Sequence, residues 1–167
     1  MTDAPGYTAF GFTDQEWGLV TGLPQSVLTA ASAAAPNGTR KTRAENAAGL
    51  AAIADGRASA SPLVSAVATE LTTRVGDPEL GEELPIIEPA DPTGYADDVL
   101  GRAAAVTRLL AARVGDGDAG AYRRWLVDIA ETVVSAATTG GVFGIGGADV
   151  TETERAFCEQ LSHVLSD

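Results

Sequence analysis

Cysteine is almost absent from this sequence, and long apolar runs are absent altogether. One of the 167 residues is a cysteine, Cys158, which rules out a disulfide within the chain. No stretch approaches the roughly twenty apolar residues that a membrane-spanning helix needs, and the sequence does not start with a charged and apolar leader pattern. We therefore expect a protein that folds without disulfides, does not insert into a membrane and is located in the cytoplasm.

Basic residues are also scarce. The chain has 11 Lys and Arg residues against 23 Asp and Glu residues, which gives a net charge of -12 at pH 7. An acidic surface repels phosphate backbones, and no basic patch with interleaved aromatic residues is present to overcome that repulsion. Nucleic acid is therefore not expected as a partner.

Few residues could support nucleophilic catalysis. The single histidine, His163, falls on the polar side of the last predicted helix, whereas Cys158 falls beside Phe157 near its apolar face. Two carboxylates could still act as acid and base, but among 23 acidic residues a chance pairing carries no information. The sequence favours a protein that is not an enzyme and has no cofactor.

Helical periodicity dominates what the sequence does contain. Apolar residues recur at spacings of three and four, and no alternating strand pattern occurs. We predict a single all-α domain, residues 1–167, built as a bundle of about six helices. Two pseudo-repeated helical halves, residues 13–76 and 93–167, are joined by an acidic, proline-rich linker, residues 77–92. The core anchors are chiefly Trp17, Leu28, Ile53, Leu71, Leu100, Leu110, Trp125, Ile129, Phe157 and Leu161.

Capping signals and breakers mark the helix boundaries. The N-cap signals are Thr13-x-x-Glu16, Ser61-Pro62 and Thr151-x-x-Glu154, and Phe12 and Trp17 add a hydrophobic staple to the first of them. Gly22 and Pro24 are expected to break or kink the first helix, and Gly115 to Gly120 is expected to form a turn. Further helices are predicted over residues 39–55, 61–75 and 94–114 and up to residue 136.

The segment 138–154, TTGGVFGIGGADVTETE, is rich in glycine but matches no nucleotide-binding motif. It has no lysine, which a phosphate loop requires, and its glycine order and its position after a helix do not fit the dinucleotide fingerprint. We interpret it as a connector between two helices. Its apolar tip, Val142, Phe143 and Ile145, is predicted to pack back on the bundle and is a candidate interaction site.

Acidic residues end this segment and form a candidate cation site. Calcium and magnesium take several carboxylate and carbonyl oxygens as ligands. Asp149, Glu152 and Glu154 are the candidate ligands, with Asp55 as a further one. The alternative is structural, because capping and the helix dipole also favour acidic residues in a first helical turn.

The linker region carries the highest density of acidic residues. From Asp77 to Asp98 there are eight acidic residues and no Lys or Arg, and four prolines in this stretch favour an extended path. A strip of this charge suits a basic protein partner, with Glu82 and Glu83 as candidate contacts. A solvated connector without a partner is the alternative.

The two halves share a local pattern. Residues 51–59, AAIADGRAS, precede a helix from Ser61, and residues 146–154, GGADVTETE, precede the last helix. This arrangement resembles the tellurite-resistance TerB-like helical proteins, in which each of two helical halves carries an acidic turn. The resemblance covers residues 39–71 and 121–165, and it implies metal binding at the turns and a role in stress response. Residues 122–154 are also similar to uncharacterised small bacterial helical proteins.

Two functional hypotheses follow from these features. The first is a non-enzymatic interaction or accessory module, associated with stress, that acts through contacts with a basic protein partner. The second is a domain that binds or senses a divalent cation, calcium or magnesium, at the turn of residues 146–154. The sequence specifies neither the identity of a partner nor an oligomeric state.

Overall fold

Helices make up all the regular structure in the computed structural model, which describes residues 6–35, 39–77, 80, 86–136 and 151–166. The elements, in chain order, are η1 (Gly6–Phe10), α1 (Asp14–Ala33), α2 (Thr39–Asp55), η2 (Gly56–Ala58), α3 (Pro62–Val75), α4 (Pro92–Arg113), α5 (Asp116–Ala136) and α6 (Glu152–Ser166). Over these ranges there is no strand, so the predicted all-α bundle of about six helices is confirmed. No helix within them is both long enough and apolar enough to cross a membrane.

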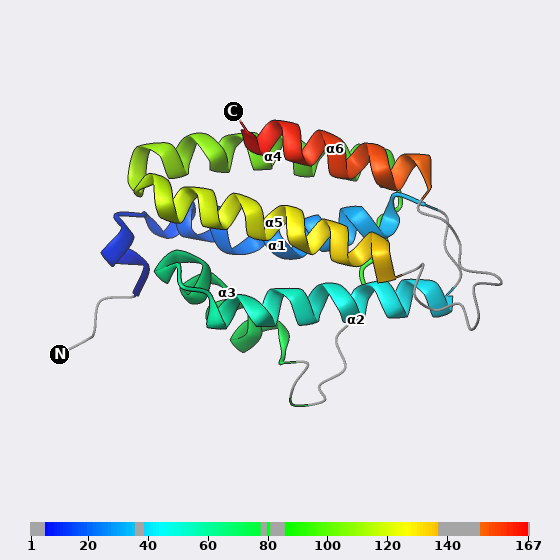
Figure 1. Cartoon of the computed structure of the whole chain (residues 1–167), viewed down its shortest axis with the longest axis horizontal. Helices are drawn as coiled ribbons and strands as arrows, with labels where there is room; N and C mark the ends of the chain where they lie inside the picture. The colour runs from blue at the N-terminus through cyan, green and yellow to red at the C-terminus, as the bar shows by residue number, and fades with distance from the viewer. Residues whose placement is uncertain (1–5, 36–38, 78–79, 81–85, 137–150, 167) are drawn as a thin grey trace.

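Helices α1 and α5 lie at the centre of the bundle. Each of them packs against all the other five α-helices. Figure 1 shows α4 and α6 on one side of this central pair, and α2 and α3 on the other. The two central helices therefore contribute many of the buried core residues, including Val20 and Leu23 of α1 and Leu126 and Ile129 of α5.

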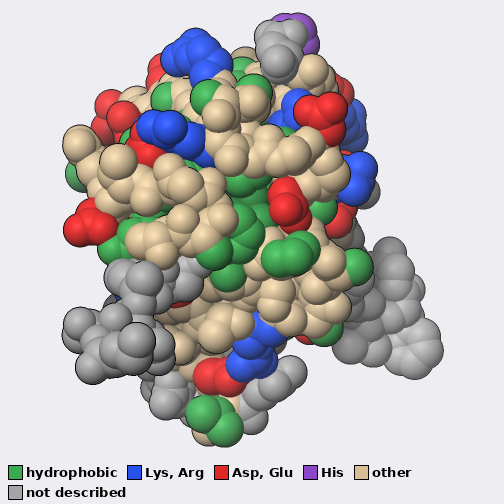
Figure 2. All heavy atoms as spheres, turned by 90° about the vertical axis from the view of Figure 1, so that its left-hand side faces the viewer, with side chains coloured by type: hydrophobic (Ala, Val, Ile, Leu, Met, Phe, Trp, Pro, Cys, Tyr) green, Lys and Arg blue, Asp and Glu red, His purple; other side chains and the backbone are tan. Residues whose placement is uncertain are grey.

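The start of α1 follows the predicted capping box and staple. The Glu16 backbone N–H donates to Thr13 Oγ1 at 3.2 Å, and the Thr13 N–H donates to Glu16 Oε2 at 2.9 Å. The rings of Phe12 and Trp17 lie 5.9 Å apart between centroids, and Tyr7 and Phe10 of η1 stack on the same indole. Figure 2 looks onto this end of the molecule and shows hydrophobic side chains in the middle of a face that charged side chains surround.

Most other boundaries also match the sequence. Helix α3 begins after Ser61, whose Oγ accepts from the Val64 N–H at 3.3 Å, and α2 spans the predicted residues 39–55. Helix α4 begins two residues earlier than predicted because Asp91 caps it, with the Gly94 N–H donating to Asp91 Oδ1 at 3.0 Å. Of the predicted core anchors, Leu100 alone is only partly buried.

Of the two outcomes expected at Gly22 and Pro24, a break or a kink, the break is wrong, because α1 runs without interruption from Asp14 to Ala33. Proline has no N–H, so Pro24 leaves the carbonyl of Val20, four residues earlier, without its partner in the helix. The buried hydroxyl of Tyr122 in α5 donates to this carbonyl at 2.6 Å. A tertiary hydrogen bond therefore replaces the missing helical one, and the helix continues through the proline.

The predicted turn over Gly115 to Gly120 is also wrong, because α5 already begins at Asp116. The Ala119 N–H donates to the Gly115 carbonyl at 3.0 Å, which is the first helical bond. Asp116 and Asp118 stand in the first turn, where negative charge interacts favourably with the helix dipole. These acidic side chains stabilise a helix start that the glycines alone do not predict.

Gly49 of α2 lies at a close contact with both α1 and α5. A Cβ atom at this position would lie 2.5 Å from Leu28 Cδ1 and 2.8 Å from Val133 Cγ2, which is closer than van der Waals contact allows. Both neighbours are themselves buried and cannot move freely. The absence of a side chain at this position is therefore what lets α2 lie against the central pair.

We expect Gly49→Ala to lower the free energy of unfolding by about 1–3 kcal/mol, because the added methyl overpacks this contact. The matched control is Gly101→Ala in α4, where a Cβ meets nothing within 4 Å. Gly101→Ala should raise the free energy of unfolding by up to about 1 kcal/mol, because alanine has a higher helix propensity than glycine. Urea unfolding followed by circular dichroism measures both, and equal effects of the two substitutions would contradict the packing.

Candidate functional site

The capping turn of α6 is the part of the predicted cation site that the structure describes best. The Glu154 N–H donates to Thr151 Oγ1 at 3.2 Å, and the Thr151 N–H donates to Glu154 Oε2 at 2.8 Å. The predicted capping box is therefore confirmed. Glu152, next to it, is exposed, and Asp149 lies outside the described residues.

Glu154 also takes part in a buried ion cluster that sequence reasoning missed. Its Oε1 lies 3.2 Å from Lys41 Nζ, which in turn lies 3.7 Å from Glu45 Oε1. Ser32 donates to Glu45 Oε2 at 2.8 Å. Both carboxylate side chains are fully buried, and the lysine is mostly buried. The cluster of Ser32, Lys41, Glu45 and Glu154 thus connects α1, α2 and α6.

The contacts of this cluster favour a structural role, in which it holds helices together, over cation binding. A buried carboxylate needs a positive or hydrogen-bonding partner, and both oxygens of Glu154 already have one. Asp55, the fourth predicted ligand, is exposed at the end of α2. Across the residues that the structure describes, no three His, Cys, Asp or Glu side chains gather as a metal site would require. Because Asp149 lies outside those residues, the cation site stays a prediction.

A shallow groove runs between α2 and α5. It consists of two adjoining cavities of about 410 and 510 Å³ that share Asp128 and Thr132 in their walls. Asp55 lines the first cavity and Glu131 lines the second. All three carboxylates are exposed. We call this feature the α2–α5 groove.

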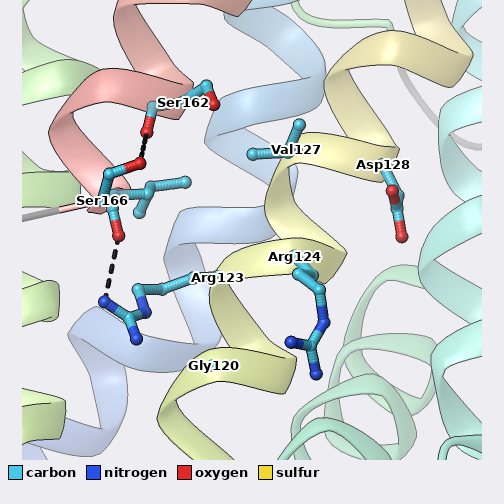
Figure 3. Close-up of a pocket in the computed structure, with 8 residues that line it drawn as sticks. Gly120, Arg123, Arg124, Val127, Asp128, Ser162 and Ser166 are labelled. Atoms are coloured by element: carbon cyan, nitrogen blue, oxygen red, sulfur yellow. Dashed lines mark hydrogen bonds between the residues drawn. The ribbon is translucent and has the colours of Figure 1, made fainter.

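A second groove, of about 400 Å³, lies on the other side of α5, next to α6. Arg123 and Arg124 both line it, but Figure 3 shows that their guanidinium groups point in different directions. Arg123 donates to the Leu165 carbonyl at 3.2 Å and so caps the end of α6. The two arginines therefore do not converge on an anion.

The described residues of the acidic stretch from Asp77 to Asp98, which covers the linker and the start of α4, are mostly exposed and partly anchored. Arg57 holds Asp77 by two contacts, at 2.6 and 3.4 Å, and Asp98 pairs with Arg102 at 3.0 Å. Glu88 and Asp97 are exposed. A groove of about 370 Å³ lies between residues 87–89 and 92 of this region and residues 32–35 at the end of α1, with Thr42 beside them.

The remaining predicted interaction residues cannot be placed. Glu82 and Glu83 lie outside the described residues, and so do Val142, Phe143 and Ile145. Their proposed roles stay predictions.

The single thiol is not set up as a nucleophile. Burial raises the pKa of Cys158 to about 11, and the nearby carboxylates of Glu131, Glu154 and Glu159 act in the same direction. His163 is exposed on α6, and no hydrogen bond joins it to the thiol within the described structure. The thiol therefore stays protonated at neutral pH.

Comparison with known proteins adds no family. No family model, no curated protein and no solved structure matches this chain. Function is therefore inferred from the residues and surfaces described above.

We expect Lys41→Met to lower the free energy of unfolding by about 3 kcal/mol, because it leaves two buried carboxylates without their ammonium partner. Arg108→Met, which removes an exposed charge of the same sign from α4, should change it by about 0.5 kcal/mol or less. Thermal unfolding of both variants at one pH and salt concentration tests this. A Lys41 variant as stable as the Arg108 variant would show that the cluster contributes little.

We expect the folded protein to react with iodoacetamide at pH 8 roughly a hundredfold more slowly than the chain unfolded in guanidinium, because an ordinary thiol has a far larger thiolate fraction at this pH. Since the folded pKa is raised to about 11, reactivity should climb as the pH rises towards that value. Mass spectrometry of the alkylated protein over time measures both rates. Equal rates in the two states would contradict the buried, protonated thiol.

Proposed function

We propose that this protein is a helical interaction module that binds a basic, partly apolar segment of a protein partner along its linker. One observation carries the proposal. The large hydrophobic side chains that are exposed in the described structure are Leu19, Leu80 and Ile87, at 43%, 75% and 51% exposure. The last two, which are the most exposed, both lie in the linker, where the acidic residues are concentrated.

Exposed apolar and acidic side chains on one segment suit a partner that carries the complementary chemistry. Apolar surface gains from being covered, at roughly 25 cal/mol per Å². Carboxylates at the edge of such a contact attract Lys and Arg, which speeds association and selects the partner by charge. Among the described acidic residues from Asp77 to Asp98, Glu88, Asp91 and Asp97 have no ion-pair partner, unlike Asp77 and Asp98. Asp91 caps α4, so Glu88 in the linker and Asp97 in the adjoining first part of α4 are the ones that remain available among the described residues.

The groove beside Ile87 gives the contact a place for an apolar side chain. Its walls combine small residues of α1, such as Ala34, with Ile87 and Pro89 of the linker, and Glu88 stands at the same groove. A basic segment with one apolar side chain could therefore place that side chain in the groove while its charges meet the carboxylates. This is a common form of recognition, with apolar anchors inside a polar rim.

The proposal also covers where the protein is located and what kind of role it has. A cytoplasmic location, a non-enzymatic role and an association with stress response are proposed from the composition and from the resemblance to TerB-like proteins. The protonated thiol of Cys158 and the exposed His163 support a binding role over nucleophilic catalysis within the described structure.

We expect the double substitution Glu88→Gln, Asp97→Asn to weaken binding of a basic peptide about tenfold at low salt, since each edge charge contributes up to about 1 kcal/mol. The probe is a fluorescent peptide of lysine and leucine that contains proline and stays extended. Fluorescence anisotropy measures its affinity, and added salt should weaken the binding.

The control for that experiment is Asp116→Asn, Glu159→Gln, which removes the same amount of charge from exposed positions at the start of α5 and on α6. It should change the affinity about twofold or less, because its charges lie outside the proposed contact. Ile87→Ser should weaken binding without changing its salt dependence. Equal weakening by both double variants would show non-specific attraction and would count against the linker as the binding surface.

A further inference from the structure

The α2–α5 groove lies outside the linker, and the proposed linker contact gives its small and acidic lining residues no role. Figure 1 shows α2 running beside α5, and the two cavities of the groove follow this boundary from Ala121 to Ala136 of α5. At a rise of 1.5 Å per residue, that stretch of α5 is roughly 22 Å long, which corresponds to about four helical turns. The groove is therefore long enough for a helix of about the same length.

Small residues form the α2 side of the groove. Ala48, Ala52 and Gly56 follow one another at intervals of four residues, so they lie on one face of the helix and its 3-10 extension. The Trp125 indole donates to the Ala52 carbonyl at 3.2 Å, and a Cβ on Gly56 would come within 2.7 Å of its ring. The small residues thus let the helices approach closely, and they leave a shallow depression with the tryptophan in it.

The net charge on the groove is negative, and its carboxylates form no ion pair within the described structure. None of the carboxylates of Asp55, Asp128 and Glu131 has an ion pair or hydrogen bond in the described structure. Asp55 precedes η2 but does not cap it. Arg124 is the one basic residue along the groove in the described ranges, so the lining carries a net charge of about -2. In Figure 3 the Asp128 carboxylate points away from Arg123, towards the α2 side of α5.

The walls favour a helical occupant over an extended one. Both walls are α-helices, whose backbone N–H and C=O groups are already paired, so they offer no edge to an extended strand. A helix brings its own backbone hydrogen bonds and can lay its side chains into a trough between two others. Asp128 and Glu131 are three residues apart on α5 and can face two basic residues one turn apart on such a helix.

We propose that the α2–α5 groove binds a lysine- or arginine-bearing α-helix of the protein partner, as a docking surface separate from the linker. This inference rests on the proposed function, because it assumes a basic partner, and it adds the secondary structure and the second place of contact. The occupant places small or short side chains over Ala52 and Trp125 and basic side chains opposite Asp128 and Glu131.

The test uses the full chain, labelled with nitrogen-15, and two synthetic peptides of lysine and alanine about 16 residues long. One peptide forms a helix, and in the other two central alanines are replaced by proline, so that charge is kept and the helix is lost. The two tryptophans of the chain give two indole N–H signals, one from Trp125 in the groove and one from Trp17 in the aromatic cluster at the start of α1.

We expect the helical peptide to shift the Trp125 indole signal and to leave the Trp17 signal in place. Asp128→Asn, Glu131→Gln should weaken this binding about tenfold, whereas Asp116→Asn, Glu159→Gln should change it about twofold or less. Glu88→Gln, Asp97→Asn should leave the Trp125 shift intact. The proline peptide should bind the groove at least several-fold more weakly.

Three results would overturn the inference. The first is an unmoved Trp125 signal at saturation, the second is equal affinity for the two peptides, and the third is no effect of the Asp128 and Glu131 substitutions. If the extended lysine and leucine peptide still binds the linker in these cases, the proposed function stands without the groove. If neither peptide class binds at all, both proposals are wrong.

Discussion

The hydrogen bond between the Tyr122 hydroxyl and the Val20 carbonyl is the interaction on which the rest of the bundle depends. Pro24 removes the helical partner of that carbonyl, and an unsatisfied buried carbonyl would cost about 1–3 kcal/mol. Tyr122 is fully buried and its pKa lies well above the ordinary value, so the hydroxyl keeps its proton and donates. One bond therefore keeps α1 continuous and fixes its position along α5, and these two helices contact all the others.

The second constraint is the small size of the residues that α2 and the following η2 place against the central helices. Gly49 has no room for a Cβ between Leu28 and Val133, and Gly56 has none beside Trp125. Close approach of this kind buries the aromatic ring, but it also leaves the outer side of the α2 and α5 boundary shallow. The small residues thus explain two features: they allow the close packing that stabilises the fold, and they leave the groove that we propose for binding.

The charges divide into two groups with different roles. Lys41 pairs with the buried carboxylates of Glu45 and Glu154 and so connects α2 to α6, and removing the lysine would leave both carboxylates uncompensated. Most remaining acidic residues are exposed, and Glu88 in the linker and Asp55, Asp128 and Glu131 in the α2–α5 groove form no ion pair within the described structure, whereas Asp77 is held by Arg57. A protein with a net charge of -12 and unpaired acidic surfaces is suited to recognising basic partners.

The sequence predicts a structural feature well when the interacting residues are close together in the chain, and poorly when they are far apart. The helix starts at Thr13, Ser61 and Thr151 are local, since each N-cap bonds an amide within three residues, and all three are predicted correctly.

The errors arise where a distant residue decides the outcome. Pro24 looks like a helix breaker until Tyr122, almost a hundred residues later, supplies the missing bond. Glu154 looks like a capping acid and a candidate ligand, and its pairing with Lys41 has no signal in a single sequence.

A double-mutant cycle between Tyr122→Phe and Pro24→Ala tests the central claim most directly. With Pro24 present, removing the hydroxyl leaves the Val20 carbonyl unpaired, and the free energy of unfolding should fall by about 1–3 kcal/mol. With alanine at position 24, the restored N–H can pair with that carbonyl, so the same substitution should cost at least about 1 kcal/mol less. A cost of Tyr122→Phe that is the same in both backgrounds would contradict the account.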